Sequence, residues 1–277
     1  MQRIPVSAWW LSMVLAAAPV GAATAGPPKT PPDGLQYQRV SFSVALSQTN
    51  FDTQLRSDSS PGVRGTLVSG EDDLALPKDK LTGLADLTVR IWDRHRFRFG
   101  TDFLSLNRNG ETALSRPILY GGSVYRLGDT TRTTLDLRRY TATYLYSPIR
   151  NEKFELAAGI GLALFDFASA LEVPARGLDE ADDGMAPVPH LAVEGLWRFS
   201  RHWYVEGRAR YLQASVSKAN ASEQAFSAAV VWAWQPGMAL SLGYQSQEVE
   251  AESRFSGAPG LFRLKTSGPQ LAVRVGF

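Results

Sequence analysis

The chain ends in a segment of strict alternation that closes on an aromatic residue. The last seven residues are Leu271-Ala272-Val273-Arg274-Val275-Gly276-Phe277, with apolar side chains at every second position. A period of two is that of a β-strand, so one face of this strand is apolar and the other carries Arg274. An apolar face suits lipid, and strands in lipid have to close into a barrel because no backbone group can be left unpaired there. The alternation therefore predicts an all-β transmembrane barrel.

The first 25 residues have the pattern of an export signal. Met1-Gln2-Arg3 supplies a cationic start, residues 6–20 form an apolar core, and Ala23-Thr24-Ala25 is a small-x-small cleavage site. An uncleaved anchor is disfavoured, because the apolar stretch is shorter than the roughly 20 residues of a spanning helix. We therefore expect a signal peptide over residues 1–25 with cleavage after Ala25, a periplasmic lead-in over residues 26–36, and an outer-membrane barrel over residues 37–277.

The composition excludes several kinds of chemistry. The chain has no cysteine, which excludes a lipoprotein anchor, disulfides and thiol catalysis. It has 29 Lys+Arg and 27 Asp+Glu and no basic stripe, so no nucleic-acid partner is expected. No motif for a cofactor or a metal ion is found. A soluble periplasmic β-protein is the competing interpretation, and the strands have to decide between the two.

Ten segments of the chain read as strands of an up-and-down antiparallel barrel, with eight as the main alternative. They cover residues 38–49, 81–92, 96–107, 134–147, 153–168, 189–199, 203–217, 224–234, 238–250 and 264–277. Each contains about the 9–11 residues that a tilted transmembrane strand requires.

The connections between these segments alternate in length. Tight turns are predicted at residues 93–95, 148–152, 200–202 and 235–237, and long polar loops at residues 50–80, 108–133 and 172–188. The last two loops, at residues 218–223 and 251–263, are shorter. Short turns on one side and long loops on the other are typical of outer-membrane barrels, whose turns face the periplasm. Both termini are therefore expected in the periplasm.

Aromatic residues cluster beside the tight turns and at the C-terminus. In a barrel they would form a girdle at the periplasmic interface, whereas a soluble sandwich has no reason to gather them at one end. The predicted girdle consists of Trp92, Phe97, Tyr146, Phe154, Phe199, Trp203, Trp234 and Phe277.

The charged residues of the strands fall on the face opposite the apolar one. Arg or Lys on the lipid face costs about 2–4 kcal/mol near the bilayer midplane, so these charges are expected in the lumen. Two interpretations stay open: a hydrogen-bonded network that fills the lumen, which is favoured, and a cation-lined path for anions. The predicted lumen charges are Asp86, Arg90, Arg98, Asp102, Arg139, Glu194, Arg198, Glu206, Arg208, Arg210 and Arg274.

The sequence gives little sign of catalysis. His95 and His202 lie in predicted tight turns, and neither a Gly-x-Ser-x-Gly elbow nor a His-Glu-x-x-His motif is present. His190 is expected at the extracellular rim, just after the acidic residues Asp179, Glu180, Asp182 and Asp183. A His beside carboxylates at the rim of a ten-stranded barrel resembles the omptin proteases, although a solvated acidic loop explains it as well. We expect no catalytic residue.

Several blocks of the sequence resemble a widespread group of uncharacterised Gram-negative outer-membrane barrel proteins. They are residues 71–76, 94–99, 201–208 and 268–277, which together span most of the mature chain. This resemblance implies a barrel without an established activity and transfers no catalytic residue.

The expected role is that of a small outer-membrane barrel with a charge-filled lumen, acting in membrane structure, lipopolysaccharide contact or small-solute passage. A lipid A-modifying or omptin-like barrel enzyme is the alternative. The expected partners are outer-membrane lipids, lipopolysaccharide and the barrel-assembly machinery, which would recognise the strand that ends at Phe277.

Overall fold

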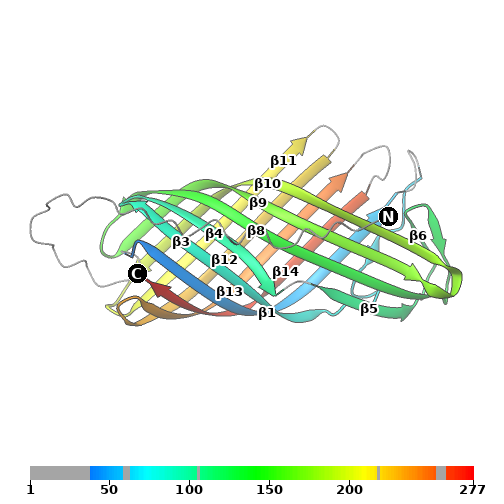
Figure 1. Cartoon of the computed structure of the whole chain (residues 1–277), viewed down its shortest axis with the longest axis horizontal. Coiled ribbons are helices and arrows are strands. Elements are labelled where there is room, and N and C mark those ends of the chain that lie inside the picture. The colour runs from blue at the N-terminus through cyan, green and yellow to red at the C-terminus, as the bar shows by residue number, and fades with distance from the viewer. Residues whose placement is uncertain (1–37, 59–62, 105–106, 217–218, 254–259) are drawn as a thin grey trace, which may run out of the picture. The chain divides into compact units, whose positions relative to one another are not determined.

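A computed structural model of the chain describes residues 38–58, 63–104, 107–216, 219–253 and 260–277. The predicted signal peptide and lead-in lie outside these residues. Within the described residues no helix is both long and apolar enough to cross a membrane. Almost all of these residues belong to antiparallel strands and their connections (Figure 1).

Ten long strands of the described residues form a closed ring, as the alternation predicted. Each pairs with the next strand of the ring in antiparallel fashion, and the last strand returns to the first, with Ser41 opposite Gly276 and Ser57 opposite Gly260. The ring therefore leaves no open sheet edge. In ring order the strands are β1 (Val40–Ser57), β3 (Asp79–Trp92), β4 (His95–Leu104), β8 (Thr130–Arg150), β9 (Phe154–Val173), β10 (Leu178–Arg198), β11 (Trp203–Val216), β12 (Ala219–Gln235), β13 (Met238–Ser253) and β14 (Gly260–Gly276).

Short elements complete the connections at one end. β2 (Val68–Ser69) pairs with β1, and β5 (Arg108–Ala113) follows β4 and pairs with β8. β6 (Ile118–Tyr120) and β7 (Ser123–Tyr125) form a small hairpin. We call the end of the barrel that carries these short strands the loop end. The tight turns and the C-terminus gather at the opposite end (Figure 1). We call that end the turn end.

The predicted loop over residues 172–188 is wrong. β9 continues to Val173 and β10 begins at Leu178, so the connection is a single 3-10 turn, η2 (Pro174–Arg176), followed by Gly177. Gly177 has a φ of 62°, in the left-handed region that glycine enters without a Cβ penalty. The polar residues that suggested a loop belong instead to strands that run on beyond the apolar belt.

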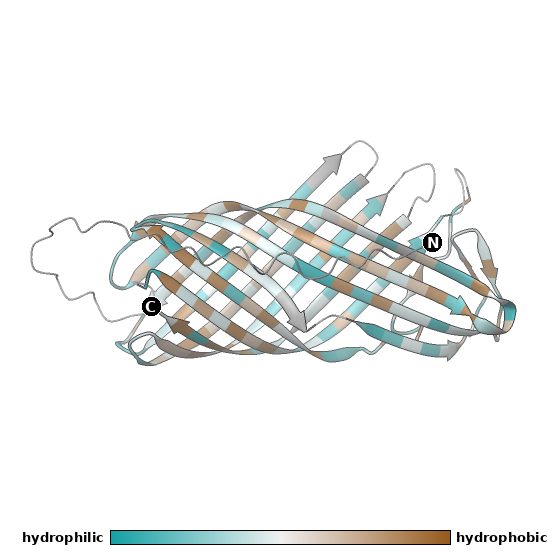
Figure 2. Ribbon diagram, in the orientation of Figure 1, coloured by the Kyte–Doolittle hydropathy of each residue, from teal (hydrophilic) through white to brown (hydrophobic). Residues whose placement is uncertain are grey.

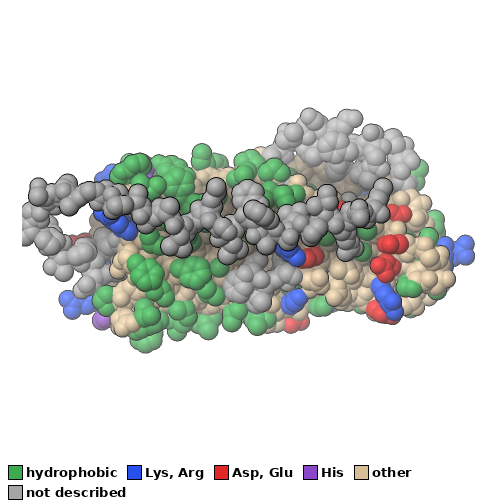
Figure 3. All heavy atoms as spheres, viewed as in Figure 1, with side chains coloured by type: hydrophobic (Ala, Val, Ile, Leu, Met, Phe, Trp, Pro, Cys, Tyr) green, Lys and Arg blue, Asp and Glu red, His purple; other side chains and the backbone are tan. Residues whose placement is uncertain are grey.

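The outer surface of the barrel carries an apolar belt next to the turn end. Along β9 the outward side chains Ile160 and Leu162 are 64% and 46% exposed, and the outward residue two positions beyond Leu164 is Asp166. On β8 the outward side chains likewise change from aromatic to charged between Tyr140 and Arg138. Hydrophobic residues alternate with polar ones along the strands (Figure 2), and on the face drawn in Figure 3 hydrophobic side chains gather toward the turn end while acidic ones lie toward the loop end. Exposed apolar side chains on every side of a closed barrel are those of a lipid-facing surface.

Beyond the belt the outward face of the barrel wall is polar and its inward face is apolar, the reverse of the arrangement within the belt. The inward side chains there are apolar, and they pack into a buried layer across the lumen toward the loop end. Its buried members are Phe51, Leu137, Ala163, Phe165 and Leu264, with Phe167, Val188, Val249 and Phe262 packed against them. This layer separates the polar lumen from the residues that cover the loop end.

Candidate functional site

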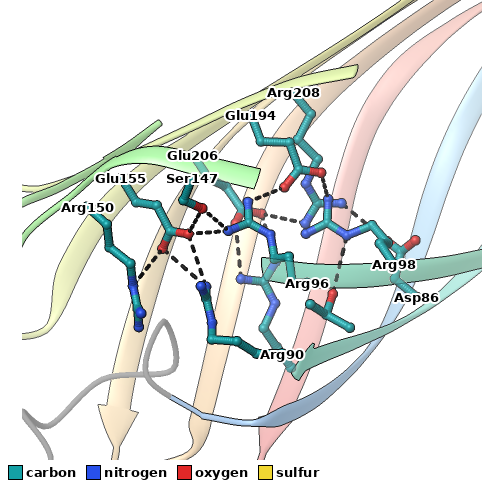
Figure 4. A network of polar contacts seen from close by, with 12 residues as sticks. Asp86, Arg90, Arg96, Arg98, Ser147, Arg150, Glu155, Glu194, Glu206 and Arg208 are labelled. Carbon is teal, nitrogen blue, oxygen red and sulfur yellow. Dashed lines mark hydrogen bonds and ion pairs between the residues drawn. The ribbon is translucent and has the colours of Figure 1, made fainter. Parts of the chain in front are cut away.

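The structure places the predicted charged residues on inward strand positions. Asp86, Arg90, Arg98, Arg139, Glu194, Arg198, Glu206, Arg208, Arg210 and Arg274 all lie there. The side chain of Asp102 lies outside the described part of the structure. The charged lumen has a lower group near the turn end, drawn in Figure 4, and an upper group nearer the loop end.

Glu155 is the first hub of the lower group. Its Oε1 accepts a hydrogen bond from Arg90 Nη2 at 3.0 Å and another from the Ser147 hydroxyl at 2.6 Å. Arg96 also bonds to it, and Arg150 lies 3.8 Å away. The Glu155 side chain is 5% exposed, so three guanidinium groups surround one buried carboxylate.

Arg96 joins this hub to a second one at Glu194. Its Nη2 donates to Glu194 Oε2 at 2.7 Å, while its Nη1 contacts Glu155, and Figure 4 shows the guanidinium between the two carboxylates. Arg98 donates to the other oxygen of Glu194 and, through Nε, to Thr88 at 3.3 Å. Both hubs therefore act as one connected network.

The third hub, Glu206, links opposite walls of the barrel. Arg274 on β14 donates to both of its oxygens, at 2.8 and 3.0 Å, and Arg208 contacts it at 3.4 Å. Arg208 also donates to Asp86 Oδ2 at 3.2 Å. Because Asp86 is on β3 and Arg208 on β11, this chain of ion pairs crosses the lumen.

The upper group contains a buried carboxylate between two arginines. Glu223 is 1% exposed, with Arg210 at 3.5 Å and Arg139 at 4.0 Å. Gln247 donates to Glu223 at 3.1 Å and accepts a hydrogen bond from Arg139. Arg139 and Gln247 come from β8 and β13, so this group spans the lumen as well.

A cavity of about 120 Å³ lies between the two groups, and we call it the central chamber. Arginines line it from two directions, Arg98 and Arg139 from β4 and β8, and Arg208, Arg210 and Arg274 from β11 and β14. Between β11 and β14, the wall of β12 and β13 carries small residues, among them Ala225, Ser227, Ala229, Ser241 and Gly243. These small residues leave room for the long arginine side chains, and part of that room stays unfilled.

Sequence reasoning missed several members of the network. Arg96 and Glu155 lie in predicted strands, at residues 96–107 and 153–168, but were not predicted to face the lumen. Arg150 and Glu223 were placed in a predicted turn and a predicted loop. For Glu155 a signal was available, because the alternation of β9 places it on the same face as Gly161. Arg96 precedes Arg98 by two residues on β4, so both side chains lie on the same face of the strand, and this spacing would have predicted Arg96 in the lumen.

The predicted girdle residues lie at the turn end of the outer surface. Trp92, Trp203 and Phe277 are 66%, 42% and 74% exposed. Several of the rings there contact each other, such as Trp203 with Trp232 at 6.2 Å between ring centroids. The other members are Phe97, Tyr146, Phe154, Phe199 and Trp234. A second set of exposed rings, which the sequence reasoning did not identify, marks the upper edge of the belt at Tyr140, Tyr211, Phe226 and Tyr244.

The prediction that His190 lies at the rim is wrong. His190 sits inside β10, opposite Gly161, and is 3% exposed, with its Nε2 3.0 Å from the Thr143 hydroxyl. Asp179 and Glu180 are about ten residues away along an extended strand, which is roughly 33 Å. The error arose because the strand continues past the belt, so the rim lies farther along the chain. Among the described residues no group of three or more His, Cys, Asp or Glu is arranged to hold a metal ion.

Comparisons with known proteins support the barrel fold but identify no family for this chain. No family model matches the chain, and no curated protein sequence matches it. The structure of the outer-membrane protease OmpT from Escherichia coli is similar, with a TM-score of 0.55, 10% identity, and coverage of 90% of this chain and 98% of that one.

Two other outer-membrane proteins superpose more loosely. The toluene transporter TodX from P. putida has a TM-score of 0.35 at 10% identity, covering 90% of this chain and 93% of that one. Neisserial surface protein A has a TM-score of 0.32 at 14% identity, covering 85% and 97%. Of these three structures, only that of OmpT has a TM-score above 0.5. At 10% identity this similarity supports the fold but no shared activity. The closed ring, its apolar belt and this fold place the protein in the outer membrane of a Gram-negative bacterium.

Proposed function

We propose that this protein is a closed outer-membrane barrel with a structural role in the membrane, and that it does not conduct solutes in its resting state. The turn end and both termini face the periplasm, the loops face outward, and residues 1–25 are removed on export. The observation that carries the proposal is the closure of the lumen at three successive levels.

The first level is the charge network. Its side chains meet from strands all around the ring and leave little free cross-section at the turn end, where a cavity of about 70 Å³ remains. The second level is the apolar layer, in which Phe51, Phe165 and Leu264 are each less than 10% exposed. An apolar constriction resists wetting, so it adds a barrier to ions that a polar lining would not give.

The third level is the covering of the loop end. Glu71, in the connection between β2 and β3, accepts hydrogen bonds from the Thr53 amide at 2.8 Å and from Arg108 at 2.5 Å. The Arg108 and Glu71 side chains are 1% and 5% exposed, and the Arg108 guanidinium lies over the Phe51 ring at 4.4 Å. This pair fixes the covering segment directly onto the apolar layer.

The decisive experiment is conductance of the purified full mature barrel in planar bilayers. The wild type and a variant that lacks residues 64–77, the covering segment, are both expected to show little current, because the charge network and the apolar layer still close the lumen. The heat-modifiable gel mobility of the protein recovered from lipid vesicles shows that it is folded in the membrane. Steady anion-selective channels in the wild type would contradict the proposal. It would be contradicted most clearly if Arg198→Glu combined with Arg208→Glu shifted their selectivity toward cations.

Small-solute passage is the second candidate. The central chamber and its wall of small side chains favour it, since they leave room in the middle of the lumen. A passage role would require the apolar layer and the Glu71–Arg108 pair to open. A rim enzyme of the omptin kind receives no support from geometry, because His95 and His202 lie at the turn end and His190 inside the wall.

The structural role is proposed to involve lipopolysaccharide. Arg138 and Lys265 lie just beyond the belt, with side chains 50% and 47% exposed, at the level where lipid phosphates would lie. Loss of the gene should then raise sensitivity to large hydrophobic antibiotics. Complementation with Arg138→Glu plus Lys265→Glu should restore resistance less well than the wild type, at equal protein level in the membrane.

A further inference from the structure

We propose that the upper part of β10, residues 178–185, is a docking site for an extended basic peptide, which would add to the barrel wall as a further β-strand. We call this stretch the β10 edge. The inference goes beyond the structural role and does not depend on it. It rests on three features: the pairing of β10, the prolines below the edge, and the charge that the edge carries.

The β10 edge has a neighbouring strand on one side. Toward β9 the pairing of β10 is continuous from Leu178 to Trp197. Toward β11 it covers only the stretch from Leu191 to Arg198, and no described residue pairs with β10 on that side above this stretch. Figure 1 shows β10 continuing toward the loop end beyond the tip of β11. The ring is therefore closed from Leu191 downward, and the open edge lies in the part of β10 that extends above it.

Two prolines explain where the pairing with β11 stops. Pro187 and Pro189 lie opposite Leu164 and Leu162 in an unbroken β9–β10 ladder. Proline has no N–H, so in an unbroken ladder its nitrogen faces the other side, which is the side of β11. Neither proline can donate a hydrogen bond to β11, and the β10–β11 ladder accordingly ends at Leu191. Because proline lacks the donor, no N–H is left unpaired at these two positions beside the lipid.

The backbone groups of the β10 edge face the same open side. Groups two residues apart along a strand point the same way, so those of Asp179, Ala181, Asp183 and Met185 share the side that Pro187 faces. Unlike proline, each of these four residues offers both an N–H and a C=O. A row of this kind is a template for strand addition, in which an extended peptide gains main-chain hydrogen bonds along its length.

The charge of the β10 edge selects the partner. Asp179 and Asp183 are exposed, and on the neighbouring strand β9 the residues opposite Asp179 and Met185 are Glu172 and Asp166. An added strand would bring its side chains to about 5 Å from those of β10, where opposite charges attract and like charges repel. Lysine or arginine opposite the two exposed carboxylates is therefore favoured. A second copy of the chain, paired edge to edge, is disfavoured because it would bring the same carboxylates to both sides of the new ladder.

These positions define a sequence pattern for the partner. In an antiparallel register the residue opposite Met185, which is 63% exposed, comes first and is apolar. The residues opposite Asp183 and Asp179 come two and six positions later and are basic. The peptide Leu-Thr-Lys-Thr-Val-Thr-Lys has this pattern, and its β-branched residues favour an extended strand.

The first test measures binding of this peptide to the full mature barrel in detergent micelles. The peptide carries fluorescein at its amino end, and fluorescence anisotropy is the readout. The wild type should bind it saturably. A peptide with glutamate at both lysine positions should bind at least about tenfold more weakly, since like charges then face each other across the ladder.

Two N-methylated peptides test whether the backbone pairs. Methylation of the third and fifth residues removes two donors that face β10 in the proposed register, whereas methylation of the fourth and sixth residues removes two donors that face away. The first change should weaken binding at least about tenfold and the second should leave it within about twofold. Equal binding of the two methylated peptides would contradict strand addition.

Variants of the β10 edge test the same contacts from the side of the protein. Ala181→Pro removes one N–H from the open side and is compatible with the β9 ladder, as Pro187 and Pro189 are, whereas Ala181→Val keeps the N–H. The proline variant should bind the lysine peptide more weakly, and the valine variant should bind it as the wild type does. Asp179→Lys combined with Asp183→Lys should reverse the preference, so that the glutamate peptide binds more tightly.

Heat-modifiable gel mobility shows whether each variant is folded. If Ala181→Pro does not fold, the two methylated peptides on the wild type decide the matter. Absence of saturable binding to the wild type, or equal affinities for the lysine and glutamate peptides, would overturn the proposal. A wild type that is dimeric in micelles by light scattering, together with a monomeric Ala181→Pro, would show that the edge pairs with a second copy and would overturn it as well.

Discussion

Arg208 Nη1 and Asp86 Oδ2 lie 3.2 Å apart although their strands stand opposite each other in the ring, with β11 five places from β3 in a barrel of ten. A single ion pair thus spans the interior through two side chains. Together with Arg139 and Gln247, which also meet from strands five places apart, it connects walls that share no backbone hydrogen bond. The lumen therefore contributes to holding the ring together as well as to closing it.

The closed ladder should give the protein a heat-modifiable mobility. Because β14 pairs with β1 at both of its ends, the closed ring has no open edge at which detergent can begin to separate the strands. Unboiled samples should run at a different apparent mass from boiled ones on a denaturing gel. Recovery in the soluble periplasmic fraction, with identical mobility before and after heating, would refute the barrel.

Removing Glu206 should destabilise the barrel. In Glu206→Ala, Arg274 and Arg208 lose a carboxylate within 3.4 Å, and breaking one partner of a buried ion pair typically costs about 3–5 kcal/mol, less where lumen water reaches the site. Glu111→Ala is the control, since its pair with Arg132 is more than half exposed and is worth about 0–1 kcal/mol. Urea unfolding in lipid vesicles, followed by tryptophan fluorescence, measures both. Equal midpoints for the two variants would favour a lumen wet enough to screen its charges.

Phe277→Asp should impair assembly into the membrane. The carbonyl of Phe277 accepts hydrogen bonds from Arg39 and Val40, its amide donates to Val40, and its ring is 74% exposed at the girdle. An aspartate there would put a charge at the lipid interface and alter the strand end expected to be read by the assembly machinery. The control is Leu127→Asp, at an exposed position between β7 and β8. The folded fraction in outer-membrane preparations should fall for Phe277→Asp and stay unchanged for Leu127→Asp.

The covering segment at the loop end should loosen in acid. Hydrogen bonding to the Arg116 guanidinium holds the pKa of the Asp73 carboxyl below its usual value. Since the folded pKa is depressed, the stabilisation is present above the ordinary pKa near 4 and is lost as pH falls through the folded value. The protection of the amides of residues 64–77, measured relative to the intrinsic exchange rate at each pH, should therefore fall below about pH 4, and Asp73→Asn should show that lower protection at pH 7. Asp72→Asn, whose pair with Lys78 is about 70% exposed, should leave exchange at pH 7 as in the wild type.

Alternation predicted the strand number and the facing of the charges because both follow from a period of two along a single strand. It could not predict which charges meet. The partner of Arg208 is set by the stagger of ten strands, and no local pattern in β11 encodes the position of Asp86 in β3.

The strand ends were misjudged for a different physical reason. Within the belt, β9 has Ile160 outward and Gly161 inward, but beyond it Asp166 points outward and Phe165 inward. A strand that leaves the membrane exchanges its polar and apolar faces, because lipid outside is replaced by water and the lumen by a packed core. Because the outward face was expected to be apolar along the whole strand, the upper parts of β9 and β10 were predicted to be a loop. For the same reason His190 was predicted to lie at the rim.

The long strands also decide what other cells and molecules meet at the bacterial surface. β8, β9 and β10 have 21, 20 and 21 residues, and about 20 residues tilted by 45° reach roughly 47 Å along the barrel axis, against an apolar band of about 25 Å. In the proposed orientation a wall of paired strands some 20 Å high stands clear of the hydrocarbon. Antibodies or phages that recognise it would bind side chains brought together from neighbouring strands, so their epitopes would be conformational. A peptide copied from residues 130–140 or 164–173 would not compete with them, and boiling the protein would abolish their binding.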